Sequence, residues 1–300
     1  MDQVHGEGRQ EVGRGDGTLY VVATPIGNLE DITLRALKVL AAADVITAED
    51  TRTTATLLAR HGIGKRPVAL HAHNEARMAG QVLQWLREGR SVALVSDAGT
   101  PGLSDPGALV VARAMEAGLR VVPVPGANAA VSAFSASGLA EGRFLFYGFL
   151  PARASARRTA IAGLDRLACA LVFYEAPHRV LESIDDLAAG LPGERTIVIA
   201  RELTKVFESI ASMPLREAAA WMRADANRQR GEFVVIVSGA PEKGEQTTAA
   251  WESLLAILLA ELPLAQAVRL TCAATGARRK VVYEHALAAA ALAKRDEQGE

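Results

Sequence analysis

Three loops of this chain are dense in glycine and proline, and each follows an apolar run. They are residues 24–29 (TPIGNL), 97–107 (DAGTPGLSDPG) and 125–129 (PGANA). Gly and Pro at this density fix tight turns, let a ligand approach the main chain and leave backbone amides free to bind it. Any one of the loops can be only a turn, but three of them at the ends of apolar runs favour a ligand site.

The residues in and around these loops narrow the chemistry of the ligand. The sequence has no G-x-G-x-x-G after an apolar run and no G-x-x-x-x-G-K-[ST], so the usual signatures of dinucleotide and triphosphate sites are missing. Residues 96–112 contain neither Lys nor Arg, which argues against a polyanion. The loops therefore favour a mainly neutral ligand gripped by backbone groups, such as a nucleoside that carries an amino-acid-like arm.

Polar side chains follow two further apolar runs, at residues 48–54 (AEDTRTT) and 70–75 (LHAHNE). Asp50 or Thr51 can simply cap the helix after the first run, and Asn74 the helix after the second. Their shared place at the ends of predicted strands also suits a polar wall that faces a substrate. Both interpretations stay open.

The elements that must position these residues are short apolar runs that alternate with amphipathic stretches. Continuous apolar strands between helices are typical of a mostly parallel sheet covered on both faces. We therefore predict an α/β domain at residues 18–148, after a flexible tail at 1–17. Its predicted strands are 18–24, 44–49, 67–70, 91–96 and 119–124, with a weaker one at 145–149, and its predicted helices are 31–42, 51–61, 75–88, 106–117 and 127–137.

A second α/β domain is predicted at residues 149–240, opening with an exposed basic linker around residues 151–158. The close succession of AREL and KVFESI predicts a hairpin, so we expect antiparallel pairs in its sheet. Its predicted strands are 169–175, 196–203, 205–210 and 232–239, and its predicted helices are 177–189 and 214–223.

Residues 241–300 are predicted to form a linker and a helical extension. Within it, residues 264–283 contain four basic residues and no acidic one, in the order helix, turn at Gly276, helix. This pattern is typical of a small helix-turn-helix with a basic edge, and equally of a helical hairpin that packs on the core or on a partner.

The overall composition excludes several classes of protein. The chain has 300 residues, 50% hydrophobic and 22% charged, with a net charge of −1, so it is neither disordered nor globally polycationic. Cys169 and Cys272 lack the paired spacing of a zinc site, and the pair His71 and His73 has no matching ligand cluster, so we expect no metal. No apolar run reaches the length of a membrane span. We expect a soluble, cytoplasmic protein.

Long motifs in one order give the chain its resemblance. It resembles the tetrapyrrole methylase superfamily of class III S-adenosylmethionine-dependent methyltransferases, and within it the branch that acts on ribosomal RNA. Tetrapyrrole-making relatives typically have Gly-Asp-Pro where this chain has Ser96-Asp97-Ala98. The motifs that carry the resemblance are 23–29 (ATPIGNL), 48–52 (AEDTR), 73–75 (HNE), 96–107, 125–127 (PGA), 174–179 (YEAPHR) and 200–205 (ARELTK).

The resemblance implies two α/β domains with S-adenosyl-L-methionine in the cleft between them, in a homodimer. It implies 2′-O-methylation of a cytidine ribose in the decoding region of 16S rRNA in the small ribosomal subunit. Asn128 departs from the family, where a smaller residue is common. The cofactor contacts carried over from the family are Ile26, Asp97, Gly99, Thr100, Gly126, Ala127, Asn128, Ala129, Tyr174, Ala200, Glu232 and Phe233.

Placement at the ends of predicted strands suggests catalytic residues, and the basic residues of the chain suggest RNA contacts. Asp50 and His73 are the candidates to accept the hydroxyl proton, with Arg52 and Arg179 holding phosphates or orienting the acidic group. Two alternatives remain: methylation of a small tetrapyrrole precursor, which needs no basic extension, and a non-catalytic RNA-binding or ribosome-assembly factor. The predicted RNA contacts are Arg153, Arg157, Arg158, Arg179, Arg278, Arg279 and Lys280.

Overall fold

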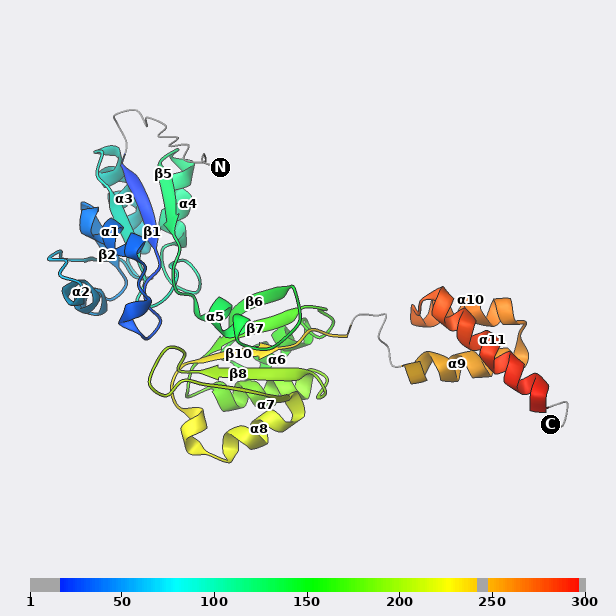
Figure 1. Cartoon of the computed structure of the whole chain (residues 1–300). Helices are drawn as coiled ribbons and strands as arrows, with labels where there is room; N and C mark the ends of the chain where they lie inside the picture. The colour runs from blue at the N-terminus through cyan, green and yellow to red at the C-terminus, as the bar shows by residue number, and fades with distance from the viewer. Residues whose placement is uncertain (1–16, 242–247, 297–300) are drawn as a thin grey trace, which may run out of the picture.

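The computed structural model describes residues 17–241 and 248–296, which form two five-stranded sheets with their helices and a three-helix unit (Figure 1). The tail predicted at 1–17 and part of the predicted linker fall almost wholly outside the described residues. Among the described helices, none is long and apolar enough to cross a membrane.

The first sheet is parallel, in the order β3-β2-β4-β1-β5. Its central strands are buried on both faces, because α1 and α2 cover one face and α3 and α4 the other. This confirms the predicted parallel sheet. The elements are β1 (Thr18–Val22), a 3-10 turn (Leu29–Asp31), α1 (Leu34–Ala42), β2 (Val45–Ala48), α2 (Thr51–Arg60), β3 (Val68–Ala69), α3 (Glu75–Arg87), β4 (Val92–Val95), α4 (Ala108–Glu116) and β5 (Arg120–Val124).

Strands β1 and β4 lie side by side, and the chain leaves them in opposite directions, from β1 toward β2 and from β4 toward β5. Ligands of open α/β sheets bind at such a switch point, beyond the carboxyl ends of the strands. Here the loops that follow β1 and β4 are joined, since Thr24 and Gly99 exchange backbone hydrogen bonds of 2.9 and 3.0 Å. The topology therefore brings two of the three glycine-rich loops together.

The second sheet is mixed, in the order β6-β7-β10-β8-β9, with β6 and β7 parallel and the other pairs antiparallel. Helices α6, α7 and α8 cover one face, and α5 packs on the other. The elements are α5 (Ala129–Ser135), β6 (Phe144–Phe149), α6 (Ala154–Ala162), β7 (Ala170–Glu175), α7 (Val180–Gly190), β8 (Thr196–Arg201), β9 (Ser209–Pro214), α8 (Leu215–Arg223), a 3-10 turn (Ala226–Gln229) and β10 (Phe233–Val237).

The positions of two predicted strands are wrong. The weak strand at 145–149 is predicted in the first domain, but β6 pairs with β7, so the second sheet begins before residue 148. The strand predicted at 205–210 begins instead at Ser209. Glu202 and Thr204 have φ values of 53° and 64°, a left-handed conformation that cannot continue a strand. The predicted hairpin between β8 and β9 is confirmed.

The three C-terminal helices have a core of their own. They are α9 (Thr248–Glu261), α10 (Leu264–Thr275) and α11 (Arg279–Asp296), and Figure 1 shows them as a separate unit beyond the second sheet. Trp251, Val268 and Val282 are among the side chains buried at their centre. Gly276, with a φ of 72°, ends α10 and makes the predicted turn between the helices.

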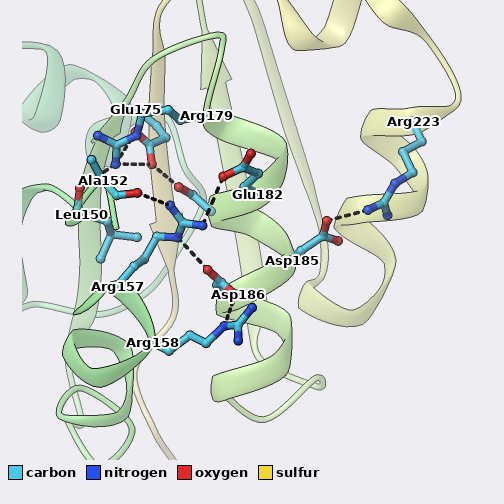
Figure 2. A network of polar contacts seen from close by, with 11 residues as sticks. Leu150, Ala152, Arg157, Arg158, Glu175, Arg179, Glu182, Asp185, Asp186 and Arg223 are labelled. Carbon is cyan, nitrogen blue, oxygen red and sulfur yellow. Dashed lines mark hydrogen bonds and ion pairs between the residues drawn. The ribbon is translucent and has the colours of Figure 1, made fainter. Parts of the chain in front are cut away.

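A buried ion cluster joins α6 to α7 (Figure 2). Arg157 is 2% exposed and donates to Asp186 at 2.6 Å and to Glu182 at 3.4 Å. Arg158 reaches the other oxygen of Asp186 from the surface, at 2.8 Å. Burial alone raises the pKa of Asp186, but hydrogen bonds from Arg158 and Arg157 hold it below its usual value. The predicted exposure of the basic linker is therefore wrong at Arg157, whose side chain faces α7 and not solvent.

Replacing Asp186 with Ala leaves the Arg157 guanidinium buried without its main partner. We expect Asp186→Ala to lower the free energy of unfolding by about 3–5 kcal/mol, measured by urea denaturation. The control is Asp185→Ala, since Asp185 pairs with Arg223 on the surface, where removal of an ion pair costs about 0–1 kcal/mol. Equal losses in the two variants would show that the buried cluster does not hold α6 to α7.

Candidate functional site

A cavity of about 520 Å³ opens between the two sheets, at the carboxyl ends of β1 and β4. The first domain contributes the ends of all three glycine-rich loops, and the second contributes the ends of β7, β8 and β10. Most of the predicted cofactor contacts line it. These are Ile26, Gly99, Thr100, Asn128, Ala129, Tyr174, Ala200, Glu232 and Phe233.

Three predicted cofactor contacts do not line this cavity. Asp97 lines a neighbouring hollow and accepts the backbone N–H of Asp50 at 2.7 Å. Gly126 allows a close approach, because a Cβ there would lie 2.9 Å from the Cβ of Ala23. The carbonyl of Ala127 accepts the hydroxyl of Thr100 at 3.2 Å. In the structure, these three residues shape and join the loops that line the cavity.

Asn128, the departure from the family pattern, has a local role. Its side-chain oxygen accepts the N–H of Val131 at 3.0 Å and so caps α5. In the first turn of α5, the N–H of Ala130 donates to the hydroxyl oxygen of Tyr174 on β7 at 3.3 Å. The larger side chain therefore turns toward its own helix, and the start of that helix is tied to the second sheet.

The sequence analysis missed part of the cavity wall, above all Leu103, Ser104 and Asp105. Ser104 has a φ of 71° and sits against the β-bulge of β6, where a Cβ on Gly148 would lie 3.1 Å from the Ser104 hydroxyl. This contact carries the loop after β4 across to the second sheet. The available signal was the Asp-Pro-Gly turn at residues 105–107 of that loop. Phe149 and His178 also line the cavity and were not predicted.

The rim on the side of the first domain is acidic. Burial raises the pKa of Asp105 above its usual value; a hydrogen bond from Ser96 opposes this and the nearby charge of Asp97 adds to it. Burial, with the charges of Asp105 and Asp97, also raises the pKa of Glu49. Among the described residues that line the cavity, none is Lys or Arg. The site therefore suits a cationic group better than a phosphate.

Asp50 has a different environment from these carboxylates. It caps α2, accepting the N–H of Arg52 at 2.8 Å, and its second oxygen accepts the Arg52 guanidinium at 2.7 Å. These hydrogen bonds lower the pKa of Asp50 to about 2. A carboxylate with so low a pKa is a weak proton acceptor at neutral pH. The capping interpretation is confirmed, and the geometry does not favour Asp50 as the general base.

The residues after β3 support the loops from outside the cavity. His73 is exposed beyond edge strand β3 and lines neither this cavity nor the hollow next to it. The side chain of Asn74 accepts the N–H of His71 and does not cap α3. Glu75 accepts the N–H groups of Gly107 and Leu109 at 2.8 and 3.0 Å, which fixes the start of α4. This cluster therefore holds the loop at 97–107.

Arg179, predicted to contact RNA or orient an acid, is also structural. Its side chain is 18% exposed and pairs with Glu175 at 3.3 Å (Figure 2). It donates as well to the carbonyl of Leu150, at the end of β6. Arg179 thus joins the ends of β6 and β7 beneath the cavity. In residues 17–241 and 248–296, no group of three or more His, Cys, Asp or Glu side chains is arranged to hold a metal ion.

The two domains meet at backbone distance beside the cavity. The N–H of Asn28 donates to the hydroxyl of Thr204 at 3.0 Å. A Cβ on Gly27 would lie 2.6 Å from the Lys205 side chain, 2.8 Å from the Thr204 hydroxyl and 3.0 Å from the Leu203 carbonyl. Only glycine at position 27 therefore allows this contact between the loop after β1 and the loop at 202–208.

Comparisons with known proteins match most of the described chain. The model of the Tetrapyrrole (Corrin/Porphyrin) Methylases family matches residues 18–219, and the model described as RsmI C-terminal HTH domain matches residues 245–290. The chain is 50% identical over 273 residues to Ribosomal RNA small subunit methyltransferase I of Pseudomonas aeruginosa, covering 90% of this chain and 97% of that protein. It is 48% identical to the protein of the same name from Escherichia coli O157:H7, over 93% of this chain and 97% of that one.

Solved structures show the same fold. The methyltransferase CobJ aligns with a TM-score of 0.57 at 23% identity, over 75% of this chain and 95% of that one. Uroporphyrin-III C-methyl transferase from Thermus thermophilus, complexed with S-adenyl homocysteine, aligns with a TM-score of 0.53 at 18% identity, over 74% of this chain and 97% of that one.

A methyl group at position 27 should force the two domains apart. We expect Gly27→Ala to lower the free energy of unfolding by about 1–3 kcal/mol, as overpacking does, and to widen the molecule in small-angle X-ray scattering. The control is Gly80→Ala on α3, where a Cβ meets nothing within 4 Å. That change should stabilise the helix by up to about 1 kcal/mol. Unchanged stability and dimensions in Gly27→Ala would disprove the tight contact.

Proposed function

The chain belongs to the tetrapyrrole methylase family, in the group of ribosomal RNA small subunit methyltransferase I, and on this premise we propose that it methylates 16S rRNA with S-adenosyl-L-methionine. The observation that carries the proposal is similarity of 42–50% identity along nearly the whole chain to relatives of that name. The match includes the helical unit as well as the two sheets. The finer part of the proposal is that the acceptor is the 2′-oxygen of a cytidine ribose.

The cavity fits this cofactor in size and in chemistry. At about 520 Å³ it lies in the range of small-molecule sites. Ile26, Leu103 and Phe149 offer apolar surface to a purine ring, while Thr100 and Asn128 offer polar groups. The absence of Lys and Arg among the described lining residues suits a ligand without phosphates. When bound, S-adenosylmethionine supplies an electrophilic methyl group on a sulfonium.

Asp105 is the residue that we assign to the cofactor's positive charge. It is the acidic side chain of the loop after β4 that lines the cavity. Besides burial, the charge of Asp97 raises the pKa of Asp105, and the charge of Asp105 raises the pKa of Glu49. A cationic ligand group next to Asp105 relieves this repulsion. In the free protein the carboxylates repel one another, whereas a bound cationic group would attract Asp105.

The catalytic contribution that we infer is mainly positioning. Asp50 stays ionised with a pKa of about 2, and His73 lies away from the cavity, so neither has the geometry of a general base. The two domains instead hold the reacting groups in line and exclude water from the cleft. The transfer would break the sulfonium's sulfur–carbon bond as the ribose oxygen bonds the methyl carbon, leaving S-adenosylhomocysteine. The hydroxyl proton would pass to water at the mouth of the cleft, because neither Asp50 nor His73 is placed to accept it.

The surface for the RNA combines exposed basic residues of two parts of the chain. Arg278, Arg279 and Lys280 are exposed at the start of α11, and Arg153 and Arg158 are exposed on α6 and just before it. Arg157 and Arg179 are left out of this surface because both are bound within the protein. We further infer a cytoplasmic homodimer, for which the exposed apolar side chains of edge strand β6, among them Leu145 and Tyr147, provide a surface.

The decisive test is methyl transfer to small ribosomal subunits from cells that lack this methyltransferase. We expect label from S-adenosylmethionine on one 2′-O-methylcytidine of 16S rRNA, identified by nuclease digestion and nucleoside mass spectrometry. Because basic residues meet phosphates, binding of the subunits should weaken steeply as salt rises. Label on a base would refute the 2′-oxygen as the acceptor. No label on subunits or naked rRNA, despite cofactor binding, would refute the whole proposal.

The role of Asp105 is tested by Asp105→Asn. We expect cofactor affinity, measured by calorimetry, to fall by about tenfold or more, because a charge-assisted contact is lost. The raised pKa means that Asp105 stabilises the free protein below its unfolded pKa of about 3.9 and that this contribution is lost as pH rises through the folded pKa. At pH 7 the free variant should therefore unfold at or above the wild-type temperature, and the difference should shrink below pH 4.

The matched control for this variant is Glu116→Gln, which removes one exposed carboxylate from α4. It should change neither the cofactor affinity nor the melting temperature. If Asp105→Asn keeps wild-type affinity, or loses affinity only because the free protein is destabilised at pH 7, the assignment of Asp105 is wrong.

A further inference from the structure

Three neighbouring hollows follow the contact between the two domains, from the cavity toward the surface. The cavity of about 520 Å³ shares Ile26, Ala98 and Glu232 with a hollow of about 220 Å³. That hollow shares Gly27, Leu29 and Lys205 with an open groove of about 1020 Å³. We call this last hollow the outer groove. Because neighbouring hollows share lining residues, the outer groove and the cavity flank the same small hollow along this contact.

The outer groove ends at two unusually exposed apolar side chains. Val206, which lines it, is 93% exposed, and its neighbour Phe207 is 70% exposed. Both lie at the tip of the β8–β9 hairpin, in residues 202–208. Single exposed apolar residues are common on protein surfaces. Here an aromatic ring stands beside the entrance of a site whose acceptor carries aromatic bases.

The tip that carries this ring is held rigidly. Arg201 donates to the carbonyl of Phe207 at 3.0 Å and to that of Arg230 at 3.3 Å. Lys205 donates to Glu202 at 2.9 Å and to Glu232 at 3.0 Å. Burial alone lowers the pKa of Lys205, but these two hydrogen bonds raise it, so Lys205 stays charged. A preorganised loop presents its side chains with little further loss of entropy on binding.

The charges of the outer groove suit a strand of nucleic acid. Arg60 is exposed in the last turn of α2, and next to it His61 has a buried Nε2 with no hydrogen-bond partner among the described residues. Glu30 is the one acidic residue among the described residues that line the groove, and Lys205 is already paired with two glutamates. Arg60 is thus the cation that remains to meet a phosphate.

We propose, on the basis of the function proposed above, that the outer groove binds the single-stranded RNA next to the target nucleotide and that Phe207 stacks on one of its bases. Arg60 contacts a phosphate of the same strand. Aromatic rings combined with cations are the usual means of gripping unpaired RNA. Two apolar residues are too few for a stable protein interface, which buries about 800 Å² on each partner. The ring stands next to Val206 beside the outer groove, which adjoins the hollow next to the cavity.

The test compares three variants of Phe207 on small subunits from cells that lack this methyltransferase. We expect Phe207→Ala to raise KM and the Kd for subunits by about tenfold to a hundredfold, the usual effect of losing one stacked base. Phe207→Trp should keep wild-type values, whereas Phe207→Leu, apolar but unable to stack, should behave like Ala. Cofactor affinity should stay unchanged in all three. Met115→Ala, which removes an exposed apolar side chain from α4, is the control.

The outcomes separate this proposal from the function on which it rests. Wild-type KM and Kd in Phe207→Ala would overturn it, and so would a Leu variant as good as Trp, because packing alone would then suffice. A dimer that dissociates in sedimentation, with unchanged Kd for subunits, would make the tip a protein contact and overturn it. A wild-type protein that transfers no methyl group but binds subunits through Phe207 would refute the function and support the groove.

Discussion

The site depends on a close approach of main chain between the two domains. Gly27 meets the carbonyl of Leu203 at a distance that leaves no room for a Cβ, and Gly148 forms the bulge against which Ser104 rests. At each contact a glycine on one domain receives a strained loop of the other. The cavity, the hollow beside it and the outer groove all lie along this contact. Without it the chain has two separate α/β domains and no enclosed site.

The electrostatics of the site are unfavourable to the empty protein. Asp105 and Glu49 have raised pKa values because burial and mutual repulsion penalise their charged forms. Asp50, only a residue away from Glu49, has its pKa lowered because Arg52 and the start of α2 bind its carboxylate. The chain thus stabilises the charge of one acid and penalises the charges of two others by burial. Of these two, Asp105 lines a cavity without Lys or Arg among its described lining residues, and a cationic ligand can exploit its charge.

Features encoded locally could be predicted from the sequence, and those that depend on packing could not. Parallel strands covered on both faces appear as apolar runs, so the first sheet and the three loops at its edge were predictable. Which sheet β6 joins depends on pairing with β7, to which its own sequence gives no clue. Arg157 belongs to an arginine-rich segment, and only the placement of α7 shows that it is buried. Asp105 was missed because its environment comes from residues distant in sequence.

Backbone strain connects these observations. Among the described residues, those other than glycine with positive φ are Ser104, Glu202 and Thr204, and all three lie on the two loops that cross between the domains. Each such conformation costs about 1–3 kcal/mol and persists only where the surroundings enforce it. Glycine at these positions would relieve the strain, yet it would also free the loops and remove the Thr204 hydroxyl that binds Asn28. The side chains are therefore retained at a cost in stability, because a loose contact between the domains could not hold two reactants in line.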